Sequence, residues 1–283
     1  MRFPVKLNRG GWPQALTRYL PSAADVRVLC QARVEAGAFT DSVSSLKFGT
    51  TFKTTGRARF PNTITALAAL DFAFPPAILD VGASDGSTSL DIMRAVPFSR
   101  YFVTDRNIEI RAMHRDESTW FFDADDSCIM AVSDRWVSYP DFDGAWFPFG
   151  GMARRLFAGA PALDWSAQRI QLISPALRAL VDDRIAIRRH DIFEPWAEPS
   201  VGLVIAANIL NRAYFSDEQI VAAVANLVDA TTPGGRIVIV DNREVEASTI
   251  FRVHAGRVEL EVSLNGGTDI ESLVLISNGR THD

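Results

Sequence analysis

The sequence predicts an α/β fold with a doubly wound, mostly parallel seven-stranded sheet and an antiparallel C-terminal edge. From residue 76 onward, short apolar runs alternate with segments of helical periodicity, an order typical of parallel strands joined by crossover helices. The run Val201–Ala207 is continuously apolar, as in a strand that is covered on both faces. We therefore expect one sheet domain over residues 76–283, preceded by an N-terminal helical arm over residues 1–75.

Composition supports a globular protein and narrows its partners. The 283 residues are 47% hydrophobic and 22% charged, which suits a chain with a sizeable core. With 29 basic and 34 acidic residues the net charge is −5, so we expect no nucleic-acid partner. The two cysteines and four scattered histidines show no metal-site spacing. The N-terminus has no apolar signal segment and no apolar run is long enough for a membrane span, so we expect a cytoplasmic protein.

The N-terminal arm shows short helical patterns. Apolar residues at helical spacing over 16–20 and 26–34 predict two short helices. A third helix is expected to start at Asn62-Thr63, which have side chains that often cap helices, and to end before Pro75-Pro76.

The strands and helices of the sheet domain follow in order. Helices are expected over 87–96 and after Ser216, where Gln219 completes a capping box. A Pro-Gly-Gly turn at 233–235 ends that second helix. The parallel strands are expected at Ala77–Val81, 101–104, Ile185–Arg189, Val201–Ala207 and 236–240.

Near the end of the chain, strand and helix patterns no longer alternate. Residues Arg257–Leu264 alternate between apolar and polar, Asn265-Gly266-Gly267 forms a turn, and residues 270–276 alternate again. No helical segment separates the two runs, so we expect them to pair as an antiparallel hairpin on the sheet edge.

An insertion over 116–165 interrupts the sheet domain after the second parallel strand. Residues 118–139 predict a β-hairpin with its turn at 124–127. Four of the six tryptophans fall here, at Trp120, Trp136, Trp146 and Trp165. We expect the hairpin aromatics to bury the hairpin, and residues 140–160 to form a lid over an acceptor site. An aromatic and basic segment can also lie on a membrane surface, a reading that we disfavour in this acidic chain.

Candidate ligand-binding residues cluster between the first parallel strand and the helix that follows it. Asp80 is followed by Gly82, Ala83, Ser84 and Gly86, whose backbone can approach a ligand at the helix N-terminus. Asp105 ends the next strand, where an acid can accept both hydroxyls of a ribose. A dinucleotide fingerprint needs glycines at positions one, three and six, but Ser84 and Ser87 occupy two of them, which disfavours a nicotinamide dehydrogenase.

These residues resemble the class I S-adenosylmethionine-dependent methyltransferases. Asp80, Gly82 and Gly86 match the family's first motif, with Ser84 in place of the middle glycine, and Asp105 matches its acid after the second strand. His190-Asp191-Ile192-Phe193 corresponds to the third-strand motif, and Leu273–Ile276 to the reversed last strand. The resemblance covers roughly residues 76–277 and implies S-adenosylmethionine as cofactor, with no metal.

The resemblance also implies roles for individual residues. The cofactor-binding residues would be Asp80, Gly82, Ala83, Ser84, Gly86, Asp105, Arg106, Asp191, Ile192 and Asn208. Asn208 would lie near the transferring methyl group, with Tyr214 and His190 as further catalytic candidates and Asn211 and Arg212 nearby. Transfer from an activated sulfonium is an in-line displacement that depends mostly on positioning the acceptor.

The sequence leaves more than one class of methyl acceptor possible. We expect a small-molecule acceptor. The run 207–215 is similar to the corresponding stretch of chemotaxis-receptor glutamate methyltransferases, which makes a protein carboxyl side chain the alternative. Residues 1–75 do not resemble the receptor-binding domain of those enzymes. A non-catalytic module that binds S-adenosylmethionine is the third hypothesis. The oligomeric state cannot be read from the sequence.

Overall fold

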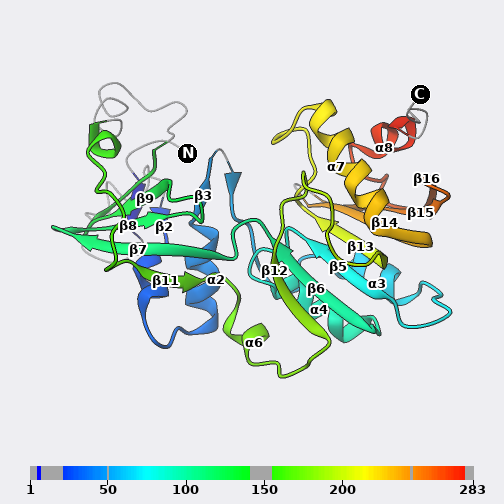
Figure 1. The fold of residues 1–283 in the computed structure, drawn as a ribbon, viewed down its shortest axis with the longest axis horizontal. Helices are drawn as coiled ribbons and strands as arrows, with labels where there is room; N and C mark the ends of the chain where they lie inside the picture. The colour runs from blue at the N-terminus through cyan, green and yellow to red at the C-terminus, as the bar shows by residue number, and fades with distance from the viewer. Residues whose placement is uncertain (1–4, 8–21, 50, 141–154, 243–244, 278–283) are drawn as a thin grey trace. The chain divides into compact units, whose positions relative to one another are not determined.

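The computed structural model describes residues 5–7, 22–49, 51–140, 155–242 and 245–277. The chain forms two compact units (Figure 1). Unit 1 consists of residues 1–55 and 107–179, and unit 2 of residues 56–106 and 180–283. This division differs from the predicted boundaries: residues 56–75 group with the sheet domain, and the rest of the N-terminal arm shares a unit with a longer insertion than 116–165.

Unit 2 contains the predicted seven-stranded sheet. Its strand order is β12-β6-β5-β13-β14-β15-β16, with parallel pairing from β12 through β14 and antiparallel pairing beyond. The predicted fold class, an α/β fold with a mostly parallel sheet and an antiparallel C-terminal edge, is confirmed. The strands span Ala77–Val81 (β5), Arg100–Asp105 (β6), Ile185–Arg189 (β12), Val201–Ala207 (β13), Thr231–Asn242 (β14), Glu246–His254 (β15) and Arg257–Leu264 (β16).

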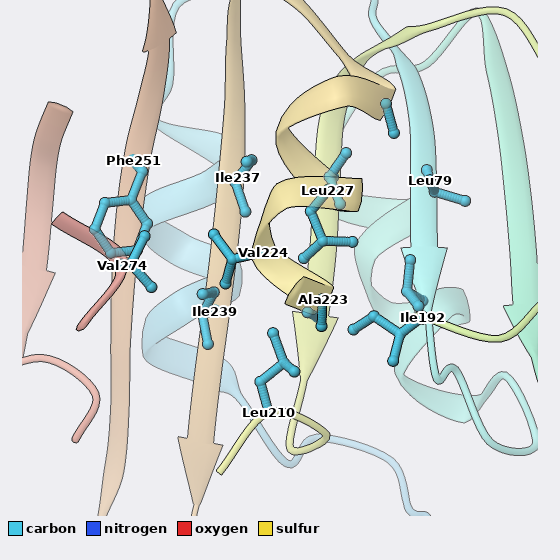
Figure 2. Packing of buried hydrophobic residues seen from close by; sticks show 14 of the residues in the cluster. Leu79, Ile192, Leu210, Ala223, Val224, Leu227, Ile237, Ile239, Phe251 and Val274 are labelled. Atoms are coloured by element: carbon cyan, nitrogen blue, oxygen red, sulfur yellow. The ribbon is translucent and has the colours of Figure 1, made fainter. Parts of the chain in front are cut away.

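Helices cover both faces of this sheet. Helices α3 (Pro61–Ala68) and α4 (Ser87–Ala95) lie on the face opposite α7 (Asp217–Ala230) and α8 (Glu271–Ser277) (Figure 1). The predicted capping box of Ser216 and Gln219 begins α7. Its apolar stripe packs between Leu79 and the strand residues Ile237 and Ile239 (Figure 2).

The C-terminal hairpin differs from the prediction. Strand β16 pairs with β15, which directly follows β14, and residues 271–277 form helix α8 instead of a strand, so the family's reversed last strand is not found at 273–276. Ile270 and Val274 are both fully buried, four residues apart. That spacing places two side chains on one helical face, and it also satisfies an alternating pattern, so the spacing alone does not distinguish a helix from a strand.

Helix α3 also begins differently from the prediction. It starts at Pro61, and its N-cap residue Phe60 provides no side-chain hydrogen bond. Asn62 and Thr63 are therefore not capping residues but lie inside the first turn, where their backbone amides need partners.

Unit 1 is built around a second seven-stranded sheet, in the order β11-β7-β8-β9-β10-β1-β2. The predicted hairpin is present as β8 and β9 within this larger sheet. The strands span Val5–Leu7 (β1), Ser22–Ala23 (β2), Glu109–Arg115 (β7), Ser118–Phe122 (β8), Cys128–Val132 (β9), Trp136–Ser138 (β10) and Gln168–Gln171 (β11). The remaining elements are η1 (Val26–Cys30), α2 (Ala36–Ser44), β3 (Lys47–Phe48), β4 (Thr51–Phe52) and α6 (Pro175–Arg178).

Aromatic residues of the insertion mainly build unit 1. Trp120 is buried and meets Phe157 edge to face at 6.0 Å between ring centroids, as we expected for hairpin aromatics. Trp165 is 97% exposed. Most of the predicted lid and the predicted helix at 16–20 lie outside the described residues, and of segment 26–34 only the 3-10 helix η1 is helical. No helix in the described part of the chain is long and apolar enough to cross a membrane.

Candidate functional site

The sequence-predicted site residues all lie in unit 2, at or just beyond the carboxyl ends of parallel strands. Strands β12, β6, β5, β13 and β14 run in the same direction, so their carboxyl ends form one edge of the sheet. We call this the carboxyl edge. Ligands of doubly wound sheets bind at such an edge, because side chains and loop amides from several strands converge there.

The loop between β5 and α4 has the sharp turns that its sequence predicts. Gly82 and Gly86 adopt positive φ angles of 70° and 78°. A Cβ atom at Gly82 would lie 2.5 Å from Cδ1 of Ile209, so a larger residue here would collide with the segment after β13. The Ala83 amide donates to the carbonyl of Thr104 at 2.9 Å, which ties the loop to β6.

Ser84 joins this loop to Asp105. Its backbone N–H donates to Oδ2 of Asp105 at 2.9 Å, although the two residues are 21 positions apart. Ser84 has a φ of 58°, a conformation that costs a non-glycine residue roughly 1–2 kcal/mol. Its hydroxyl is buried without a hydrogen-bond partner among the described residues. A buried unsatisfied hydroxyl is costly, and a ligand atom at this position would satisfy it.

Asp80 lies beneath the loop rather than on it. It is 1% exposed, and its Oδ2 accepts hydrogen bonds from the Ser89 hydroxyl at 2.6 Å and the Tyr101 hydroxyl at 2.9 Å. Burial raises the pKa of Asp80 from 3.8 to about 6, because the charged form loses its hydration. In this structure Asp80 joins β5 to α4 and β6, and its predicted contact with a cofactor stays a prediction.

The ends of β6 and β12 lie next to each other. The Arg106 guanidinium pairs with Asp191 at 3.4 Å, and the His190 amide donates to the carbonyl of Asp105. Oδ1 of Asp191 accepts from the Phe193 amide, which fixes the turn that buries Ile192. Burial lowers the pKa of His190, so the neutral imidazole is favoured near pH 7.

The segment after β13 carries the other predicted residues. Asn208 has a φ of 58°, and its Oδ1 lies 3.4 Å from the backbone nitrogen of Asn242. Asn211 is buried and accepts from the Ala213 amide, so its side chain is part of a local turn. Arg212 pairs with Asp217 at 2.8 Å and donates to the carbonyl of Asp269. Tyr214 is 37% exposed.

Arg59 belongs to no motif in the sequence, but the structure places it at the same edge. Its backbone carbonyl accepts from Nδ2 of Asn242 at 3.0 Å, and its guanidinium stacks 5.0 Å from the centroid of the Phe60 ring. Burial lowers the pKa of Arg59, and the neighbouring Asp85 and Tyr214 act in the opposite direction. In the sequence Arg59 stands two residues before a proline that starts a helix, and this pattern carries no information about the sheet.

Together these groups suit a ligand with an adenosine part. Asp105 is the last residue of β6, the strand adjacent to β5, where an acid can reach ribose hydroxyls, and the loop at 82–86 leads into the N-terminus of α4. The buried hydroxyl of Ser84 adds an unsatisfied polar atom between them. The residues present therefore fit the adenosine-bearing cofactor that the sequence implies.

Comparison with known proteins gives structural neighbours only. No family model and no curated protein matches the chain. Solved structures that resemble it include S-adenosylmethionine-dependent methyltransferases. One is the methyltransferase SibL in its apo form, with 21% identity, coverage of 64% of this chain and 35% of that chain, and a TM-score of 0.33. Another is the N-methyltransferase NodS from Bradyrhizobium japonicum, with 14% identity, 64% and 66% coverage, and a TM-score of 0.32.

A third neighbour is the O-methyltransferase NcsB1 from neocarzinostatin biosynthesis, in complex with S-adenosyl-L-homocysteine and 1,4-dihydroxy-2-naphthoic acid. It shows 15% identity, 62% and 35% coverage, and a TM-score of 0.32. The matched region spans about a third of the length of SibL and of NcsB1. With identities and TM-scores this low, the fold assignment stands on the strand order and register of unit 2 itself.

Proposed function

We propose that this chain binds S-adenosylmethionine at the carboxyl edge of unit 2 and transfers its methyl group to a small-molecule acceptor. The observation that carries the proposal is the bond between the Ser84 amide and Asp105, which couples the β5–α4 loop to the acid after β6. An adenosyl group bound at such an edge needs an acid that accepts hydrogen bonds from its ribose hydroxyls and a loop whose backbone can approach the ligand. The Ser84–Asp105 bond holds these two groups together.

Several of the predicted residues have positions that suit a role in binding. The 82–86 loop would face the amino-acid part of the cofactor, Asp105 its ribose, and Asp191 and Ile192 its adenine. Asn208 directly follows β13, the strand next to β5, where its amide can orient the reacting groups. When bound, the cofactor would supply an electrophilic methyl group on a positively charged sulfur.

The candidates for proton removal differ in availability. Arg212 and Asn211 are engaged in local structure, as described above. His190 is half-buried, with a pKa lowered by burial, so it is favoured as a neutral imidazole able to accept a proton. Tyr214 is partly exposed beside Phe215. His190 and Tyr214 therefore remain candidates to receive a proton from an acceptor that must lose one.

The cofactor assignment is tested by thermal unfolding with S-adenosylhomocysteine. At a hundred times its dissociation constant, a ligand that binds only the folded state adds about 2.7 kcal/mol to stability. We expect a clear rise in melting temperature with the wild type and a smaller rise with Asp105→Asn. The control is Asp229→Asn, an exposed carboxylate on α7. An unchanged melting temperature of the wild type would refute the cofactor assignment.

A non-catalytic binding module is the second candidate function. It is favoured by the engagement of Arg212 and Asn211 in local structure, which leaves few groups for acceptor chemistry. Incubation with S-adenosylmethionine and a panel of small hydroxy, amino and carboxy acceptors separates the two candidates. Release of S-adenosylhomocysteine that depends on an acceptor supports the enzyme, whereas binding without turnover over the panel supports the module.

A further inference from the structure

Residues 58–63 are held at the carboxyl edge by side chains from three other elements. We call this segment the strap. The Ala58 amide donates to Oδ2 of Asp91 on α4 at 2.8 Å. The Arg59 carbonyl accepts from the side chain of Asn242, the last residue of β14. The strap thus has backbone contacts to both α4 and the end of β14.

Glu246 holds the other end of the strap. Its Oε2 accepts from the Asn62 amide at 3.1 Å, and its Oε1 accepts from the Thr63 amide at 2.6 Å. Glu246 is only 8% exposed, and it provides the N-terminal cap that Phe60 does not provide for α3. A carboxylate at a helix N-terminus satisfies free amides and interacts favourably with the helix dipole.

The strap contains one positively charged residue, Arg59, whose backbone is held in place. The side chain of Asn242 donates to the Arg59 carbonyl, and the backbone nitrogen of Asn242 lies 3.4 Å from Oδ1 of Asn208. The Arg59 guanidinium is half-buried over the Phe60 ring, so its freedom is restricted.

We propose that Arg59 binds the amino-acid carboxylate of the cofactor, and that Asp91, Asn242 and Glu246 act as positioning residues for it. The inference rests on the proposed function. A guanidinium forms strong paired hydrogen bonds with a carboxylate, and it does so best when its orientation is fixed beforehand. The adjacent Asp85 places an opposite charge beside Arg59, which matches the charge pattern of a zwitterionic amino-acid group.

The direct test compares two ligands that differ in this group. S-adenosylhomocysteine carries the carboxylate, whereas 5′-methylthioadenosine keeps the adenosine and the sulfur but lacks it. With Arg59→Gln we expect the affinity for S-adenosylhomocysteine to fall about ten- to hundredfold, and that for methylthioadenosine to change less than about twofold. Arg257→Gln, at the opposite end of the sheet, should change neither affinity.

The positioning role has its own readout. Glu246→Ala should lower the affinity for S-adenosylhomocysteine about tenfold and leave the affinity for methylthioadenosine nearly unchanged. Only the contacts that fix the position of Arg59 are lost in this variant. Glu246→Gln keeps an acceptor oxygen and should restore most of the affinity. Asn242→Ala serves as a second variant if Glu246→Ala fails to fold, as judged by circular dichroism.

The outcomes separate this inference from the proposed function. If the Arg59→Gln variant loses affinity for both ligands equally, or for neither, the role of Arg59 is wrong while the cofactor assignment stands. Equal weakening of both ligands by Glu246→Ala would show a merely structural role for that residue and overturn its assignment as a positioning residue. If the wild type binds neither ligand, the proposed function falls and this inference falls with it.

Discussion

Seven described non-glycine residues adopt positive φ angles, and three of them gather around the candidate site. Ala58 lies in the strap, Ser84 in the loop after β5, and Asn208 directly after β13. The other four, Asp116, Asp126, Ala255 and Asn265, lie in turns of the chain. A positive φ at a non-glycine residue persists only where surrounding contacts enforce it, and such positions are often functional. The positions of these three residues are consistent with the location of the site.

The buried carboxyl of Asp80 predicts how the stability of the fold depends on pH. Its pKa in the folded protein is about 6, above the ordinary 3.8, because burial penalises the charged carboxylate. A group with a raised folded pKa contributes its stability in full below the unfolded pKa and loses it as pH rises through the folded pKa. The loss from Asp80 should therefore occur between about pH 4 and about pH 6.

Asp80→Asn tests this expectation, since an amide does not ionise. The stability of the variant relative to the wild type should increase by about 3 kcal/mol between acidic and neutral pH. The measurement is the free energy of unfolding in urea from pH 4 to pH 7.5, with exposed Asp229→Asn as the control. A difference that is independent of pH would show that the Asp80 pKa is not raised.

At the scale of elements, α8 shows how one pattern admits two structures. Residues 270–276 were expected to form a strand, yet the segment Glu271–Ser277 is helical, and Val274 packs beside Phe251 in the core of unit 2 (Figure 2). Val274 is 1% exposed, whereas Ile276 is 72% exposed. In an alternating strand the two residues would share a face, because they are two positions apart.

Substitutions at these two positions distinguish helix from strand. Val274→Ala should lower the free energy of unfolding by about 2 kcal/mol, because it leaves a cavity in the core. Ile276→Ala should change it by less than about 0.5 kcal/mol, because that side chain is exposed. Thermal denaturation of both variants and of the wild type measures these changes in stability. Similar losses at the two positions would contradict the helix.

At the scale of the whole molecule, each unit has a separate hydrophobic core. The core of unit 2 lies between its sheet and α7, and that of unit 1 between its sheet, η1 and α2. All the sequence-predicted cofactor residues and the strap belong to unit 2. Ligand binding should therefore stabilise unit 2 directly.

Scanning calorimetry can test this independence. We expect two unfolding transitions, of which only the one from unit 2 rises in temperature when S-adenosylhomocysteine is added. Trp120→Ala, in a smaller buried cluster of unit 1 with Met113 and Phe122, should lower the other transition by the equivalent of about 3–5 kcal/mol and leave ligand affinity unchanged. A single transition that shifts as a whole with ligand would show that the two units unfold together.

The sheet of unit 2 could be predicted because its signals are local. Each parallel strand is a short apolar run with a turn residue after it, and α7 carries its cap in its own sequence. The sheet of unit 1 could not be predicted in this way. Its strands β1 and β10 pair through Val5 and Val137, and no local pattern indicates such a pairing.

The sequence by itself determined the parallel sheet, the loop at 82–86 and the acid at Asp105, because periodicity, glycine placement and strand order express them over short stretches. Only the tertiary structure decided that unit 1 combines the N-terminal segment with the insertion, and that Arg59 lies at the carboxyl edge. Arg59 is held there through Asn242 and Glu246, which lie 183 and 184 positions from their partners. Hydrogen bonds over such separations leave no spacing in the sequence, so they become visible only when the chain is folded.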